Sequence, residues 1–146
     1  MNKNNNALFF TCSLIEYIAR KTKNKRATVV EVLGQNVERI YNYADVFHCE
    51  PIEKVADDFI TRCNITQGTY DNIITCKYEV PDYWDIGEVF ERLIEDTHTE
   101  NDAIAGIKNV YSSWLCEKIL NFNSDLYYQP REYLAECYKC GYILVA

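Results

Sequence analysis

Two runs of apolar residues at helical spacing meet at Pro51. The first run is Val37, Ile40, Tyr41, Ala44, Phe47 and His48, and the second is Ile52, Val55, Ala56, Phe59, Ile60 and Cys63. This spacing places each run on one face of an α-helix. Pro51 suits the first position of a helix, where its missing N–H breaks no hydrogen bond. The sequence therefore predicts two helices joined at a tight corner, with Asn36 capping the first.

Similar apolar stripes predict helices in most of the remaining chain. They cover residues 7–21, 29–33, 86–94 and 102–122, and a last stretch that Pro130 opens and Gly141 ends. Thr28 suits the N-cap of the helix at 29–33, and Gly34 suits its C-terminal stop. A chain of 146 residues is long enough to bury such faces in one core.

The helix at 86–94 has the clearest predicted start. Asp85 followed by Glu88 fits a capping box, in which each side chain bonds a backbone N–H of the first turn. Trp84 would then pack on Val89 as a hydrophobic staple.

Residues 65–84 are expected to form an irregular or extended connection between two helical halves. Ile74, Cys76, Tyr78 and Val80 alternate with polar residues, which predicts a short strand. Pro81 also disfavours the helical conformation at the residue before it. A helix over residues 70–78 is the alternative.

These patterns together predict an all-α fold, with a single helical domain over residues 1–146. We expect six or seven helices packed as a bundle and at most one short strand pair. Residues 1–6 are polar and are expected to be a disordered start. The apolar tail 142–145 is expected to dock on the core.

The charge of the chain is unevenly distributed. The net charge is −7, which argues against general binding to nucleic acids or anionic membranes. Five basic residues nevertheless crowd one stretch: Arg20, Lys21, Lys23, Lys25 and Arg26. This basic patch is either a solvated loop at the end of the first helix or a docking site for an acidic partner or phosphates.

The seven cysteines and the absence of a signal peptide predict a soluble cytoplasmic protein. The cysteines fall mostly on apolar faces, as reduced cysteines do, and no run of about 18 apolar residues could span a membrane. Cys137 and Cys140 are expected to be buried one helical turn apart rather than to bind zinc.

Both histidines follow an acidic residue by three positions, in Asp45-x-x-His48 and Glu95-x-x-His98. On a helix an acid and a histidine at this spacing face the same way, as in the metal sites of carboxylate bundles. A metal-dependent enzyme is therefore one alternative. We do not favour it, because Glu95 lies away from the apolar face of its helix and Asp45 replaces the usual glutamate.

Residues 28–43 predict a short helix, a glycine turn and a second helix, which is the outline of a helix-turn-helix. A small DNA-binding regulator is therefore a second alternative. The expected reading face contains Gln35, Glu38, Arg39 and Asn42 and has only one basic residue. Nucleic acid is for this reason not the favoured partner.

Two segments resemble a small, uncharacterised helical domain found in bacterial genomes. They are Phe9-Phe10-Thr-Cys-Ser-Leu-Ile-Glu16-Tyr17 and Ile40-Tyr41-Asn-Tyr-Ala-Asp45-Val-Phe-His48. The resemblance covers about the first sixty residues. It implies a bacterial helical module and brings no catalytic residues with it.

The favoured function is protein binding or self-association through a tyrosine-rich, acidic surface. Twelve tyrosines are present, and aromatic residues outside helices are harder to bury. The expected surface comprises Tyr78, Tyr83, Trp84, Tyr127 and Tyr128. Since neither a glycine-rich phosphate loop nor a nucleophile motif occurs, we expect no cofactor and favour a non-catalytic protein, while the sequence leaves catalytic activity open.

Overall fold

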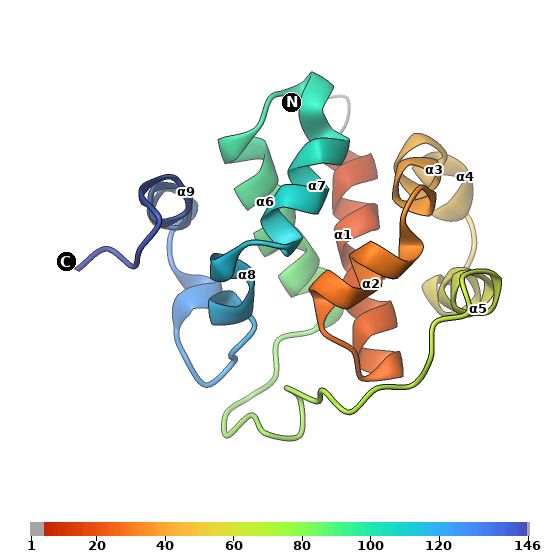
Figure 1. The fold of residues 1–146 in the computed structure, drawn as a ribbon, viewed down its shortest axis with the longest axis horizontal. Coiled ribbons are helices and arrows are strands. Elements are labelled where there is room, and N and C mark those ends of the chain that lie inside the picture. The colour runs from red at the N-terminus through yellow and green to blue at the C-terminus, as the bar shows by residue number, and fades with distance from the viewer. Residues whose placement is uncertain (1–4, 146) are drawn as a thin grey trace.

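The computed structural model describes residues 5–145, and its fold is all-α (Figure 1). The α-helices are α1 (Asn5–Thr22), α2 (Arg26–Leu33), α3 (Asn36–Asn42), α4 (Ala44–Phe47), α5 (Ile52–Arg62), α6 (Tyr83–Thr97), α7 (Ala103–Tyr111), α8 (Trp114–Ile119) and α9 (Arg131–Cys140). Two short 3₁₀ helices are η1 (Glu100–Asp102) and η2 (Leu126–Tyr128). The all-α prediction is confirmed, and no strand occurs in residues 5–145.

Helix α1 is the centre of the fold. Buried side chains surround it on nearly every side, as expected of a helix enclosed by others. It packs antiparallel to α6, since Ser13 lies beside Gly87 and Tyr17 lies beside Tyr83. Helices α3 to α5 cover one side of this pair, and α8 and α9 cover the other (Figure 1). The buried apolar side chains of both halves form one continuous cluster.

The connection between α5 and α6 is irregular, and the predicted strand at 74–80 is wrong. Backbone N–H groups of Gly68 and Tyr70 donate to the carbonyls of Thr22 and Lys23, at 2.8 and 2.9 Å. The Asn72 side chain donates to the Leu120 carbonyl at 2.8 Å. These scattered bonds to helix ends replace the ladder that a strand would need.

The first turn of α6 differs from its prediction. Helix α6 begins at Tyr83, and Asp82 is its N-cap, accepting a hydrogen bond from the Asp85 N–H at 2.7 Å. Asp85 therefore lies inside the helix, and the predicted capping box is wrong. The predicted staple partner Trp84 packs on Phe9 of α1, with ring centroids 5.5 Å apart. Contacts with α1 thus favour a start of α6 at Tyr83, after the Asp82 cap, over the predicted shorter helix that Asp85 would cap.

Two predicted helices are each divided, which raises the number of helices above the expected six or seven. The predicted helix at 102–122 breaks between α7 and α8, at Ser112 and Ser113. The two hydroxyls donate to the carbonyls of Lys108 and Val110, at 2.8 and 2.6 Å, and so compete with the helical bonds. The predicted helix over 36–48 divides at Tyr43, between α3 and α4.

Smaller shifts affect three other helix starts. Helix α2 begins at Arg26, ahead of the predicted cap Thr28. Asn36 is the first residue of α3 and Gln35 its N-cap, while Pro51 is the N-cap of α5 and not its first residue. Gly34 ends α2 as predicted, with a φ of 54° that an L side chain rarely adopts, but its ψ of −122° lies outside the expected left-handed helical region.

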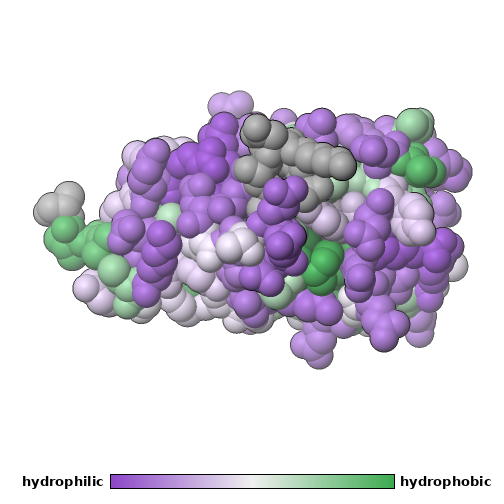
Figure 2. All heavy atoms as spheres, turned by 90° about the horizontal axis from the view of Figure 1, so that it is seen from above, coloured by the Kyte–Doolittle hydropathy of each residue, from purple (hydrophilic) through white to green (hydrophobic). Residues whose placement is uncertain are grey.

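The C-terminal tail is largely exposed, so its predicted docking is wrong for most of its length. Tyr142 and Val145 are exposed, and Figure 2 shows apolar residues projecting at this end of a mostly hydrophilic face. Leu144 alone is held, because its carbonyl accepts from the Tyr133 hydroxyl at 2.6 Å. The predicted disordered start at 1–6 lies mainly outside the described residues, and Asn6 belongs to α1.

All seven cysteines are free, and three of them are buried. Cys137 is buried as predicted, whereas Cys140 is exposed, so they do not form a buried pair. Burial raises the pKa of the Cys12 and Cys116 thiols and keeps both protonated. Among the helices that the structure describes, none combines the length and the apolar character needed to cross a bilayer.

Candidate protein-binding groove

The five aromatic residues expected to form one surface separate into two groups. Tyr83 and Trp84 lie on the first turn of α6 and pack on Tyr17 and Phe9 of α1. Tyr78, Tyr127 and Tyr128 instead line a common hollow at the end of the molecule that carries α8 and α9. The second group therefore defines the candidate site.

Local hydrogen bonds shape the turn that presents Tyr127 and Tyr128. The Ser124 hydroxyl donates to the Asn121 carbonyl at 2.8 Å and accepts from the Leu126 N–H at 3.3 Å. The Gln129 N–H then closes η2 on the Leu126 carbonyl at 3.1 Å. Pro130 follows as the N-cap of α9. Asn, Ser and Asp favour such turns because their side chains bond nearby backbone groups.

The rings at η2 form a ridge. Tyr127 packs edge-on against the buried Phe122, with centroids 5.7 Å apart, and edge-on against Tyr128 at 4.9 Å. Tyr128 remains 65% exposed, and Tyr78 on the facing loop is 69% exposed. Large rings left in solvent beside a hollow are typical of binding surfaces.

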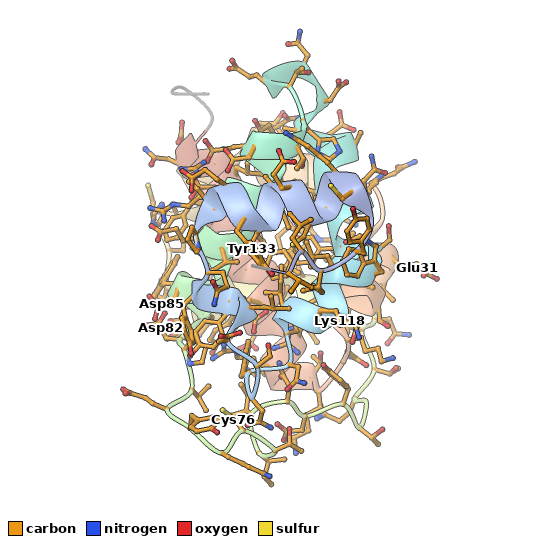
Figure 3. The ribbon with its side chains drawn as sticks, turned by 90° about the vertical axis from the view of Figure 1, so that its left-hand side faces the viewer. Glu31, Cys76, Asp82, Asp85, Lys118 and Tyr133 are labelled. Atoms are coloured by element: carbon orange, nitrogen blue, oxygen red, sulfur yellow. The ribbon has the colours of Figure 1, made fainter. Side chains whose placement is uncertain are left out.

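One hollow of about 300 Å³ lies between η2, α6 and α9, and we call it the α6 hollow. Its apolar lining comes from Pro81, Val89, Leu93 and Leu134. Its charged lining comes from Asp85, Glu88, Arg92 and Arg131. In Figure 3, η2 lies below α9, and Asp82 and Asp85 lie at its side.

A second hollow of about 610 Å³ lies on the other side of the ridge, and we call it the loop hollow. It is lined by Tyr78, Glu79, Phe122, Asn123, Ser124, Asp125, Tyr127 and Tyr128. Asn123 joins its two walls, because its side chain accepts from the Lys77 N–H at 2.7 Å and donates to the Thr75 carbonyl at 3.0 Å. The two hollows share Tyr127 and Tyr128, and together they form what we call the tyrosine groove.

The charges of the groove are acidic and unevenly compensated. Arg131 makes two bonds of 2.9 Å to Asp96, and Arg92 lies 3.4 Å from Glu88. Glu79, Asp85 and Asp125 are exposed, and no basic side chain within residues 5–145 pairs with them. Burial, and then Tyr128, Cys76, Glu79 and Asp85, raise the pKa of Tyr127. Its hydroxyl therefore stays protonated.

The five residues of the basic patch do not form a free cationic surface. Arg26 is fully buried and binds Glu16 of α1 through two bonds of 2.8 and 2.5 Å. Arg20 also binds Glu16, at 2.8 Å, and donates to the Pro81 carbonyl at 2.7 Å. The prediction of a solvated stretch is therefore wrong for Arg26. The only sign of this ion pair in the sequence is an acidic residue at position 16, on the predicted first helix. That residue alone does not show which basic residue it binds.

The three lysines of the patch are exposed, but each has a partner. Lys21 binds Asp57 at 2.5 Å, and Lys23 lies 3.9 Å from Asp71. The Lys25 ammonium lies 5.9 Å from the centre of the Tyr70 ring. These contacts leave little unpaired positive charge for phosphates, although the lysines remain within reach of solvent.

The two acid-x-x-His pairs are not brought together. The His48 ring packs on Phe10 and Trp84, with centroid distances of 5.2 and 6.2 Å, whereas His98 lies beside Tyr138. Nδ1 of His98 lies 2.9 Å from the Thr97 hydroxyl. In the described part of the chain, no three His, Cys, Asp or Glu side chains are grouped so that they could hold a metal ion. Asp45, His48, Glu95 and His98 therefore form no common centre.

The helix-turn-helix outline at 28–43 corresponds to α2, Gly34 and α3. Gln35, Glu38, Arg39 and Asn42 are exposed on or beside α3, as the prediction requires. Arg39 is the one basic residue among these four. The neighbouring cation Arg26 is buried against Glu16 and cannot supplement Arg39.

Comparisons with protein-family models, with curated proteins and with solved structures returned no match. Neither the tyrosine groove nor its acidic residues Glu79, Asp85 and Asp125 were identified as a unit from the sequence. Tyr78 and Tyr128 lie fifty positions apart, and only the packing of the connection on α8 brings them together.

Proposed function

We propose that this protein is a protein-binding module and that its partner binds in the tyrosine groove. The observation that carries the proposal is the ridge of Tyr127 and Tyr128 between two hollows, with Tyr78 and Tyr128 mostly exposed. A tyrosine ring provides a large apolar area with a polar tip, and such residues dominate the energetics of many interfaces.

The proposal favours a protein over a small molecule because the site is a two-part surface. Neither hollow is enclosed, and Tyr128, which lines both, is 65% exposed. Small-molecule sites instead surround most of the ligand. A partner chain that crosses the ridge would cover both hollows and both exposed rings.

Site-specific photocrosslinking would test the proposal. A photoreactive phenylalanine analogue at position 128 should give an adduct of one defined mass in cells that make this protein. The same analogue at position 43 is the matched control, since Tyr43 is 59% exposed at the junction of α3 and α4. Equal labelling from both positions, or none from position 128, would contradict the proposed binding face.

Size-exclusion chromatography with light scattering separates an outside partner from a second copy. If the partner is a different protein, the purified chain should be a monomer, and Tyr128→Ala should not change its mass. A dimer that Tyr128→Ala dissociates would place a second copy in the groove.

A further inference from the structure

We infer that the occupant of the tyrosine groove is a partner segment that places an arginine side chain in the loop hollow and an apolar side chain in the α6 hollow. This inference rests on the proposed function and adds the chemistry of the partner. It follows from the different linings of the two hollows.

The loop hollow is suited to an organic cation. Glu79 and Asp125 contribute carboxylates, while none of its lining residues is basic. Lys77 belongs to the same loop, but its side chain does not line the hollow. A cation placed between these carboxylates would compensate charges that are unpaired in the free protein.

The aromatic lining favours a guanidinium over a metal ion or an ammonium. Tyr78, Tyr127 and Tyr128 contribute rings, and a planar guanidinium stacks on such rings while it donates to carboxylates in a bidentate manner. Two carboxylates alone do not make a metal site, and no metal-binding group of three is found among residues 5–145. Lysine could supply the charge but not the planar stacking.

The α6 hollow is suited to a different side chain. Pro81, Val89, Leu93 and Leu134 form its apolar lining. Arg92 and Arg131 also line it, and both are already paired with acids. Glu88 is paired with Arg92, and Asp85 is the one unpaired acid of this lining. A second cation that reached Asp85 would also meet the two guanidinium groups, whereas an apolar side chain would cover the apolar lining. The two hollows thus require two kinds of side chain on either side of one ridge.

A random peptide library, selected on the intact protein, provides a probe that assumes no partner. Selected peptides whose binding is lost in Tyr128→Ala but kept in Tyr43→Ala are groove-specific. We expect these peptides to be enriched in arginine beside an apolar residue. Circular dichroism of each variant, with thermal unfolding, shows that the fold is intact.

Replacing charged groups by neutral ones of the same shape then tests whether the peptide arginine binds in the loop hollow. Replacing the arginine of the best peptide by citrulline, which keeps the shape and removes the charge, should weaken binding about tenfold or more. The double variant Glu79→Gln, Asp125→Asn should weaken the arginine peptide to the same extent and should bind the citrulline peptide as the wild type does. The matched control is Glu38→Gln, Asp45→Asn, which neutralises two exposed acids of α3 and α4 and should change neither affinity.

The outcomes distinguish the two proposals. Groove-specific peptides that lack arginine, or that bind equally well with citrulline, would overturn the arginine inference and leave the binding groove intact. Arginine peptides that respond equally to the control variant would overturn it as well. If no selected peptide depends on Tyr128, both the inference and the proposed function fail.

Discussion

Single side chains carry two unusual electrostatic features of this protein. Glu16 is fully buried in the middle of α1, and the two arginines that bind it come from α1 and α2. Burial alone would raise the pKa of the Glu16 carboxyl, but the charge and hydrogen bonds of Arg26, and then of Arg20, lower it. Glu91 lies half-buried near Glu95 and shows the opposite shift.

Removing one partner of the buried pair should be far more harmful than removing both. Arg26→Met leaves the Glu16 charge with Arg20 alone and should lower the free energy of unfolding by about 3–5 kcal/mol. Glu16→Leu combined with Arg26→Met should recover most of this loss, since no charge then remains buried. Urea unfolding of the three proteins measures both effects.

Lys54→Met is the control for this series, because Lys54 pairs with Glu50 at the surface. We expect a change below about 1 kcal/mol. A double variant as unstable as Arg26→Met would show that the loss arises from packing and not from an unpaired carboxylate.

Glu91 should make the protein less stable as the pH rises. Burial and the hydrogen bond with Glu95 raise the pKa of Glu91 to about 8. The folded state therefore binds this proton more tightly than the unfolded state, and the resulting stability is lost between about pH 4.5 and 8. Glu91→Gln should remove this decline and raise the stability at pH 8 by on the order of 1 kcal/mol. Chemical unfolding at several pH values measures this effect. If Glu91 is not responsible, the free energy of unfolding of Glu91→Gln will fall with pH as steeply as that of the wild type.

The start of α6 shows how packing with a neighbouring helix decides between two possible N-cap residues. Asp82 and Asp85 are both acceptable N-caps for α6, and the sequence around Asp85 fits a capping box better. The structure uses Asp82, which adds a turn that carries Tyr83 onto Tyr17, with ring centroids 5.0 Å apart. Packing between helices thus outweighs the local capping preference.

The effects of Asp82→Ala and Asp85→Ala should differ accordingly. Asp82→Ala removes the bond to the Asp85 N–H and should cost about 1 kcal/mol of stability. Asp85→Ala removes only a favourable charge in the first turn and should cost less than half as much. Thermal unfolding of the two variants would reject the Asp82 cap if their order were reversed.

In the assembled molecule, the backbones of α1 and α6 pack closely at Gly87. A Cβ atom at Gly87 would lie 2.9 Å from the Ser13 Cα and nitrogen, which are backbone atoms that cannot move aside. A Cβ atom at Gly106 would instead meet the side chains of Ile94 and His98, at 2.9 and 3.0 Å. An added methyl group would therefore meet backbone atoms at Gly87 and side-chain atoms at Gly106.

Gly87→Ala should accordingly be destabilising by about 1–3 kcal/mol, because the gain in helix propensity does not offset the separation of α1 from α6. Gly106→Ala should be less destabilising than Gly87→Ala, since the atoms that its Cβ meets belong to side chains and not to the backbone of a neighbouring helix. Denaturant midpoints of both variants test the comparison. Equal losses would mean that α1 and α6 tolerate a larger separation.

Periodicity in the sequence was sufficient to predict the all-α class, most helices and the irregular connection, because the burial of one helical face is a local, repeating requirement. Local pattern could not decide where long helices break or which aspartate caps α6, since those choices depend on contacts with other helices. It also could not bring Arg26 to Glu16, or Tyr78 to Tyr127 and Tyr128. Those residues become neighbours only when α2 packs on α1 and the connection packs on α8, so the buried ion pair and the tyrosine groove are products of the tertiary structure.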